Sequence, residues 1–199
     1  MICICGPSAA GKTLFAGLLA TALENAGIQA TVIGCDDYYR EHWTPDPLFG
    51  FDTVEAIDAD NLIDDLNALR SGQLKQRRRY DMGTRAVHWT PLDEGCDVIL
   101  LEGAYGPQLL LKSSPPDLLI YLEESLAVRA LRRLRRDTRE RQRTVASVLR
   151  QMLRQMIPGE RRFIKPLKEA ADVVVTRTDR GLAEAVVSII GLCSSQGTH

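Results

Sequence analysis

The 199-residue chain has no excess of charge of either sign, because 25 Lys and Arg stand against 26 Asp and Glu and leave a formal net charge of -1. This balance excludes the global basic field that nucleic-acid or membrane-surface binding would use, so any basic site must be local. No apolar run reaches transmembrane length, and no charged leader precedes the first apolar segment. We therefore expect a soluble, cytoplasmic protein with no nucleic-acid and no membrane partner.

The chain also lacks paired cysteines, internal repeats and low-complexity segments. Its cysteines are odd in number and form no C-x-x-C pair; they are Cys3, Cys5, Cys35, Cys96 and Cys193. This usage argues against a disulfide framework or a zinc site and predicts buried thiols in a reducing compartment. The length suits one α/β domain over residues 1–199.

What the chain does contain is a phosphate-binding motif near its start. Residues 6–13 match G-x-x-x-x-G-K-[ST], directly after the apolar run 2–5 and directly before an apolar helical stretch. The two glycines let backbone N–H groups curl around phosphates, Lys12 neutralises phosphate charge, and Thr13 offers a hydroxyl to Mg²⁺. The residues expected to hold the nucleotide are Gly6, Ser8, Ala9, Ala10, Gly11, Lys12 and Thr13.

Strand-like and helix-like patterns alternate along the chain. Five short apolar runs predict strands buried on both faces, at 2–5, 30–33, 98–101, 118–122 and 173–176. Apolar spacing of three and four predicts helices at 12–26, 56–70, 125–136, 144–156, 160–170 and 182–192. Residues 72–92 break the alternation and predict a small hairpin insertion over the site. The pattern predicts an α/β fold with a five-stranded parallel sheet and helices on both faces.

Acidic residues follow two of the predicted strands. Asp36 comes after the second strand, at the sheet edge where ligands of such folds bind, and can accept the proton of an attacking hydroxyl or help to hold a metal. Glu102 ends the third strand and can bind Mg²⁺ through water. Either carboxylate can instead cap the following segment. The nearby phosphate loop favours the catalytic interpretation of Asp36.

Eight arginines crowd into residues 129–143, at positions 129, 132, 133, 135, 136, 139, 141 and 143. Such a run is typical of a solvated helix face. Arginine also forms bidentate contacts with phosphate and stabilises a phosphoryl group in transfer. With a phosphate loop in the same chain, we favour an arginine-rich mobile lid over about 129–143.

These segments, taken in order, resemble the uridine kinase and phosphoribulokinase group of P-loop kinases over about residues 2–175. Asp36-Asp37-Tyr38-Tyr39-Arg40 is similar to the family's D-S-F-Y-R, which implies that Asp36 is the base for a nucleoside 5′-hydroxyl. Phe51-Asp52 matches the start of an N-F-D-H-P-x-A-x-D segment, which implies that Asp52 holds ribose hydroxyls. Tyr80-Asp81 and Glu102-Gly103 match a Y-D pair and an E-G pair, residues 136–143 resemble the lid pattern R-D-x-x-E-R-G-R, and Gln151 falls where a pocket Gln is expected.

The resemblance implies an ATP- and Mg²⁺-dependent kinase of a small molecule and assigns roles to residues. Catalytic roles fall on Asp36, Lys12, Arg136 and Arg141. Arg133 joins the loop residues in binding ATP, and the metal is expected at Thr13, Asp36 and Glu102. The acceptor is expected at Tyr39, Asp52, Tyr80, Arg85, Arg136, Arg143 and Gln151.

One departure from the family pattern concerns the acceptor. Arg85 stands where uridine kinases carry a His that contacts the pyrimidine, and the basic run 77–79 could form a wall suited to an anionic acceptor such as a sugar phosphate. The expected acceptor is the 5′-hydroxyl of uridine or cytidine, and the alternative is another hydroxylated metabolite such as a sugar phosphate. A nucleotide-regulated binding module would leave Asp36 and Asp52 without a role. A homo-oligomer is compatible with the sequence.

Overall fold

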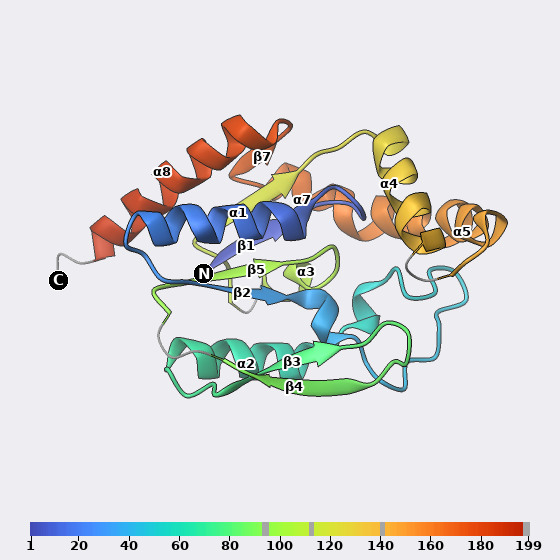
Figure 1. Ribbon diagram of the computed structural model, residues 1–199, viewed down its shortest axis with the longest axis horizontal. Coiled ribbons are helices and arrows are strands. Elements are labelled where there is room, and N and C mark those ends of the chain that lie inside the picture. Colours follow the sequence, from blue (N-terminus) through green and yellow to red (C-terminus); the bar gives the residue numbers. More distant parts are fainter. Residues whose placement is uncertain (93–95, 112–113, 140–141, 197–199) are drawn as a thin grey trace.

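The computed structural model describes the chain except residues 93–95, 112–113, 140–141 and 197–199 (Figure 1). A parallel five-stranded sheet in the order β2-β5-β1-β6-β7 forms its centre. The strands are β1 (Ile2–Cys5), β2 (Ala30–Gly34), β5 (Val98–Glu102), β6 (Leu118–Leu122) and β7 (Val173–Val175). The predicted sheet is therefore confirmed, and each strand matches its predicted run to within one residue.

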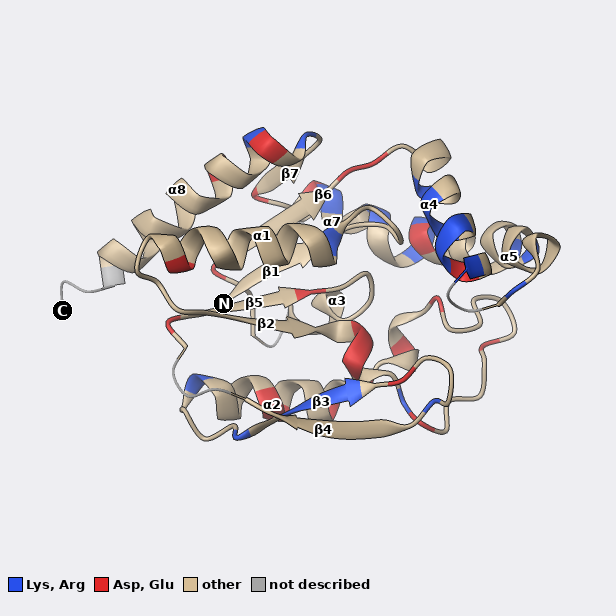
Figure 2. Ribbon diagram, in the orientation of Figure 1, with Lys and Arg blue, Asp and Glu red and all other residues tan. Residues whose placement is uncertain are grey.

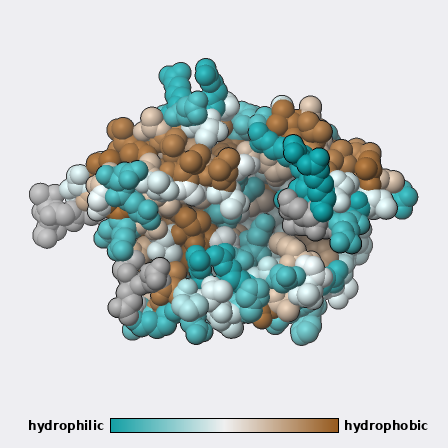
Figure 3. All heavy atoms as spheres, in the orientation of Figure 1, coloured by the Kyte–Doolittle hydropathy of each residue, from teal (hydrophilic) through white to brown (hydrophobic). Residues whose placement is uncertain are grey.

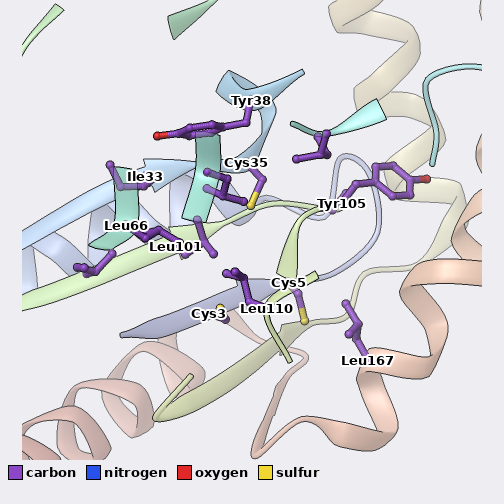
Figure 4. Close-up of a cluster of buried hydrophobic side chains, with 14 of the residues drawn as sticks. Cys3, Cys5, Ile33, Cys35, Tyr38, Leu66, Leu101, Tyr105, Leu110 and Leu167 are labelled. Atoms are coloured by element: carbon purple, nitrogen blue, oxygen red, sulfur yellow. The ribbon is translucent and has the colours of Figure 1, made fainter. Parts of the chain in front are cut away.

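β1, β5 and β6 are buried along their whole length, because helices cover both faces of the sheet. Cys3 and Cys5 point to one face, where they pack against α2 (Ala59–Arg70), α3 (Pro107–Leu110) and α7 (Lys165–Ala170) (Figure 4). Ile2 and Ile4 point to the other face and pack against α1 (Lys12–Asn25) and α8 (Thr178–Gln196). The alternation of side chains along a strand thus builds two separate cores.

The predicted insertion is a hairpin of β3 (Gln76–Tyr80) and β4 (Val87–Pro91), which pair antiparallel in a sheet of their own. It lies beside α2, below the main sheet in Figure 1. Asp37, in the 3₁₀ turn η1 (Cys35–Tyr38), joins it to the end of β2 by accepting from Tyr80 N at 3.2 Å and from Arg79 Nη1 at 2.9 Å. The hairpin is therefore fixed next to the carboxyl edge of the main sheet.

Two helices were predicted over 144–156 and 160–170, but one continuous helical segment runs through both. It consists of α5 (Val145–Gln151), the π-helix η3 (Met152–Met156), α6 (Ile157–Gly159), the π-helix η4 (Glu160–Ile164) and α7. Pro158 does not end this helical segment, because it lies in the first turn of α6, directly after a π-helix, where its missing N–H costs little. The predicted gap between the two helices, at residues 157–159, was therefore wrong.

The remaining helices differ from prediction mainly at their ends. The helix predicted at 56–70 begins at Ala59 with Asp58 as its N-cap, and the 3₁₀ turn η2 (Val54–Ala56) precedes it. α4 (Leu126–Arg139) runs three residues beyond its predicted end. Some apolar side chains of α1 and α8 are exposed, including Leu14 and Val187, and hydrophobic surface gathers over these helices in Figure 3. Within the described residues, no helix combines the length and apolarity that crossing a membrane requires.

Candidate active site

A cleft of about 1500 Å³ opens at the carboxyl edge of the sheet, between the phosphate loop, the hairpin and the helices α4 and α5. Most of the predicted site residues line it: Ser8, Ala9, Gly11, Lys12, Thr13, Asp36, Tyr39, Asp52, Tyr80, Arg85, Glu102, Arg133, Arg136, Arg143 and Gln151. Gly6 and Ala10 belong to the loop but do not line the cleft, and Arg141 lies outside the described residues. Figure 2 shows arginine-rich α4 at this end of the molecule, with acidic segments after β2 and β5.

The phosphate loop takes its shape from residues with left-handed backbone. Gly6 has φ 142° and lies so close to β6 that a Cβ atom would come within 2.4 Å of Leu122 O. Gly11, with φ 98°, is the N-cap of α1. Lys12 is 8% exposed and its Nζ donates to Pro7 O at 3.0 Å. The loop therefore presents a helix N-terminus and a lysine charge to the cleft, as an anionic phosphate requires.

Oxygen ligands for a divalent cation meet where the loop faces β5. Thr13 Oγ1 donates to Glu102 Oε1 at 2.8 Å, and burial, with the nearby charge of Asp36, raises the pKa of Glu102. A carboxylate that is buried near another negative charge is suited to a cation, so these residues fit Mg²⁺. No group of three His, Cys, Asp or Glu that could hold a metal occurs among the described residues. Phosphate oxygens and water would complete the coordination.

The opposite side of the cleft is aromatic. The ring of Tyr39 lies 6.1 Å from that of Phe51 and 5.7 Å from that of Tyr80. The guanidinium of Arg85 stacks on Phe51, with its carbon 4.8 Å from the ring centre, and Arg85 has a left-handed backbone with φ 61°. Arg85 therefore reaches the predicted acceptor pocket, as a stacked cation on an aromatic wall.

Three buried polar atoms on this side have no hydrogen-bond partner among the described residues: Asp52 Oδ2, Tyr80 OH and Tyr105 OH. Burial, together with the charges of Glu160 and Asp36, raises the pKa of Asp52 to about 6, although Arg133 opposes the shift. Arg133 Nη1 lies 3.9 Å from Asp52 Oδ1 and donates to Ser8 Oγ at 3.1 Å. One guanidinium thus touches both the phosphate loop and the acceptor side.

Three arginines of the predicted lid surround a buried carboxylate, whereas Arg132, Arg135 and Arg139 are exposed to solvent. Asp137 is 0% exposed, and its oxygens lie 3.6 Å from Arg133 Nε, 2.9 Å from Arg136 Nε and 3.6 Å from Arg143 Nη1. Gln142, where the family pattern has Gly, keeps a left-handed φ of 51°. The substitution therefore preserves the turn at some backbone strain.

The predicted basic wall of residues 77–79 is wrong, because none of these arginines lines the cleft. Arg78 is buried against the Tyr38 ring at 5.6 Å, with Nη1 3.6 Å from Asp58 Oδ2. Arg79 pairs with Asp37. Side chains alternate along β3, and the hairpin uses these charges to attach itself to η1 and α2.

Sequence reasoning gave no individual role to several residues at the site, among them Tyr105, Glu160 and Arg129. Tyr105 lines the cleft three residues after Glu102, and the Glu102-Gly103 pair was a signal that this segment approaches a ligand. Glu160 and Arg129 touch the phosphate loop from behind. Neither could be singled out, since Glu160 matches no motif and Arg129 is one arginine among eight.

These features together are the architecture of a P-loop kinase: a phosphate loop lies at the start of the first helix, a carboxylate faces the threonine of that loop, and arginines reach over both. The model of the Phosphoribulokinase / Uridine kinase family matches residues 1–183, and the chain belongs to this family. It is therefore an ATP-dependent kinase of a small molecule that works with a divalent cation, which excludes a role as a binding module alone.

Relatives and solved structures agree with this assignment. The chain is 34% identical to a uridine kinase of Staphylococcus epidermidis over 181 residues, covering 88% of this chain and 86% of that protein. It is 32% identical to a uridine kinase of Staphylococcus aureus, with the same coverage. Phosphoribulokinase from Rhodobacter spheroides shares the fold, with a TM-score of 0.58 at 18% identity over 90% of this chain and 72% of that one. A possible uridine kinase from Bacillus stearothermophilus has a TM-score of 0.58 at 20% identity, with coverage of 88% and 87%.

Proposed function

We propose that the protein transfers the γ-phosphoryl group of ATP to the 5′-hydroxyl of uridine or cytidine, with Mg²⁺ as the cation. The observation that carries this proposal is the unpartnered set of Asp52 Oδ2, Tyr80 OH and Tyr105 OH beside the Tyr39 and Phe51 rings. A ribose offers hydroxyls to such groups, and a base offers a flat face to such rings. The names of the Staphylococcus relatives point to the same acceptor.

The phosphoryl transfer follows from the groups around the cleft. The 5′-oxygen attacks the γ-phosphorus as the bond from that phosphorus to the β–γ bridging oxygen breaks, so ADP leaves with the electron pair. Asp36 takes the hydroxyl proton, because it lines the cleft together with Glu102 of the metal side and Asp52 of the acceptor side. Lys12, Arg136 and the lid residue Arg141 stabilise negative charge on the moving group. Mg²⁺ held by Thr13, Asp36 and Glu102 would neutralise phosphate charge.

The remaining predicted residues bind rather than react. Asp52 accepts from the ribose hydroxyls, Tyr39 and Tyr80 pack against the nucleoside, and Arg85, Arg143 and Gln151 contact its polar edges. Gln151 Oε1 already accepts from Arg143 Nη1 at 2.6 Å, which orients both side chains. We further propose that residues 129–143 close over bound ATP as a lid.

A second acceptor class, a sugar phosphate, is favoured by one observation. Arg150 and Arg154 line the cleft, and the described residues provide neither with a carboxylate partner. Two unpaired arginines beside an acceptor pocket suit an anionic group.

An acceptor panel in a coupled ADP-release assay separates the two classes. Uridine, cytidine, adenosine and pentose phosphates are compared at equal concentration with MgATP. We expect ADP release with the two pyrimidine nucleosides and little with the others. Release with a pentose phosphate and none with uridine would overturn the nucleoside assignment and favour the second class.

A further inference from the structure

We infer that a buried ion pair behind the phosphate loop, Arg129 with Glu160, positions this loop for ATP. Arg129 Nη1 lies 2.7 Å from Glu160 Oε1, and the two side chains are only 8% and 11% exposed. Arg129 comes from α4 and Glu160 from η4, so the pair joins two helices that are distant in sequence. Neither residue lines the cleft, and each therefore acts through the loop rather than on the ligand.

The pair holds both backbone polar groups of Ser8. Ser8 N donates to Glu160 Oε1 at 3.0 Å, and Ser8 O accepts from Arg129 Nη1 at 3.2 Å. Arg129 is itself anchored, because its Nε donates to Glu124 O at 3.1 Å, just beyond the end of β6. The chain of contacts fixes the middle of the loop relative to the central sheet.

The loop needs such a support because its next residue is strained. Ala9 has φ 62°, a left-handed conformation that costs free energy for a residue with a Cβ atom. The turn bond from Ala10 N to Pro7 O, at 3.2 Å, spans this residue. With Ser8 released, Ala9 can relax toward ordinary backbone angles, and the following N–H groups would no longer point at phosphate.

The two members of the pair are not equivalent, because ATP is an anion. Without Arg129, Glu160 would remain as an uncompensated buried negative charge close to the triphosphate site. Without Glu160, the positive charge of Arg129 would remain, and it attracts ATP. Loss of the arginine should therefore weaken ATP binding more than loss of the glutamate, and removing both should restore part of the affinity lost with the arginine.

Calorimetric titration with Mg²⁺ and a non-hydrolysable ATP analogue tests this account and requires no acceptor, so its outcome is independent of the proposed substrate. Loss of a residue that supports a metal ligand typically costs about 10–100-fold in affinity, and we expect a support of the phosphate loop to act on the same scale. We expect about a tenfold rise in Kd for Glu160→Ala, about 100-fold for Arg129→Met and about tenfold for the double variant. Glu160→Gln, which keeps an acceptor oxygen for Ser8, should recover most of the affinity.

The matched control is Glu123→Gln, which removes the exposed ion pair of Glu123 with Lys168 and should leave Kd unchanged. Unchanged Kd in folded Glu160→Ala and Arg129→Met would overturn the inference. The inference would also be overturned if the rise in Kd of the double variant equalled the product of the two single rises, because the two residues would then show no electrostatic coupling. If Arg129→Met does not fold, the comparison of Glu160→Ala with Glu160→Gln decides.

Discussion

The hydroxyl of Thr13 donates a hydrogen bond of 2.8 Å to Glu102 Oε1, across 89 residues of sequence. The contact joins the end of the phosphate loop to the end of β5, at the centre of the carboxyl edge of the sheet. Burial and the charge of Asp36 raise the pKa of Glu102, so the ionised carboxylate destabilises the folded protein. A cation bound here would offset that cost.

Glu102→Gln tests this relationship through activity and stability together. The variant keeps the shape and the acceptor for Thr13 but removes the charge. Because the folded pKa is raised, the ionised carboxylate destabilises the unliganded protein above that pKa, and the variant should melt at a higher temperature at pH 7. Its kcat should fall about 10²-fold and its Mg²⁺ requirement should rise. A normal Mg²⁺ dependence would contradict the metal role.

Asp36→Asn tests the proton acceptor. The substitution keeps size and removes the basic oxygen, so kcat should fall by about 10²–10⁴-fold while the affinity for ATP is largely retained. Steady-state kinetics and direct ATP titration measure the two quantities separately. If ATP binding collapses while kcat at saturation stays normal, Asp36 serves the nucleotide or its metal instead.

The pKa of about 6 at Asp52 predicts a pH dependence of acceptor use. Ribose hydroxyls are best bound by the ionised carboxylate, so kcat/KM for the acceptor should fall as pH drops through about 6. Asp52→Asn should have a low kcat/KM that no longer shows this step. A step of the same size in the variant would assign it to another group.

The raised pKa of Asp52 also makes stability depend on pH, and stability falls with rising pH where acceptor use improves. Between pH 3.8 and about 6 the folded protein binds a proton at Asp52 that the unfolded chain has released, so this group's contribution to stability falls as pH rises through that window. Above it, Asp52→Asn should be more stable than the parent by about 1–3 kcal/mol. Urea unfolding of both proteins at pH 7 measures the difference, and equal midpoints would show that Arg133 fully compensates the charge.

Arg85 should set acceptor selectivity. Its guanidinium offers fixed donors and a permanent charge, whereas a neutral His can both donate and accept. Arg85→His should raise kcat/KM for uridine relative to other acceptors, by a factor that corresponds to about 1–3 kcal/mol. Arg85→Ala should weaken acceptor binding, with ATP binding as the unaffected control. Unchanged acceptor kinetics in both variants would show that the stack on Phe51 is structural only.

Local patterns predicted the fold well because they coincide with its strongest physical constraints. The apolar runs at 2–5 and 118–122 can be buried only in the middle of a sheet, and the loop motif fixes the start of α1. The gap predicted at residues 157–159 was wrong because π-helices lie on both sides of it, and apolar spacing does not reveal their wider hydrogen-bond spacing.

The site could be predicted only where a motif marks it. Asp52 and Arg85 were placed by resemblance to a family, and both line the cleft. The run 77–79 misled because charge alone does not reveal the direction of a side chain: Arg78 turned out to be a buried partner of Asp58. Glu160 was out of reach, since its role depends on a contact with Ser8 across 152 residues.

The most direct test of the proposed activity is identification of the product. The protein is incubated with MgATP and uridine, and products are identified by mass spectrometry and phosphorus NMR. The account predicts equal amounts of ADP and uridine 5′-monophosphate, no product from 5′-deoxyuridine, and activity reduced about 10²–10³-fold in Lys12→Ala. Intact uridine under conditions in which a pentose phosphate is consumed, or phosphate on another hydroxyl, would contradict it.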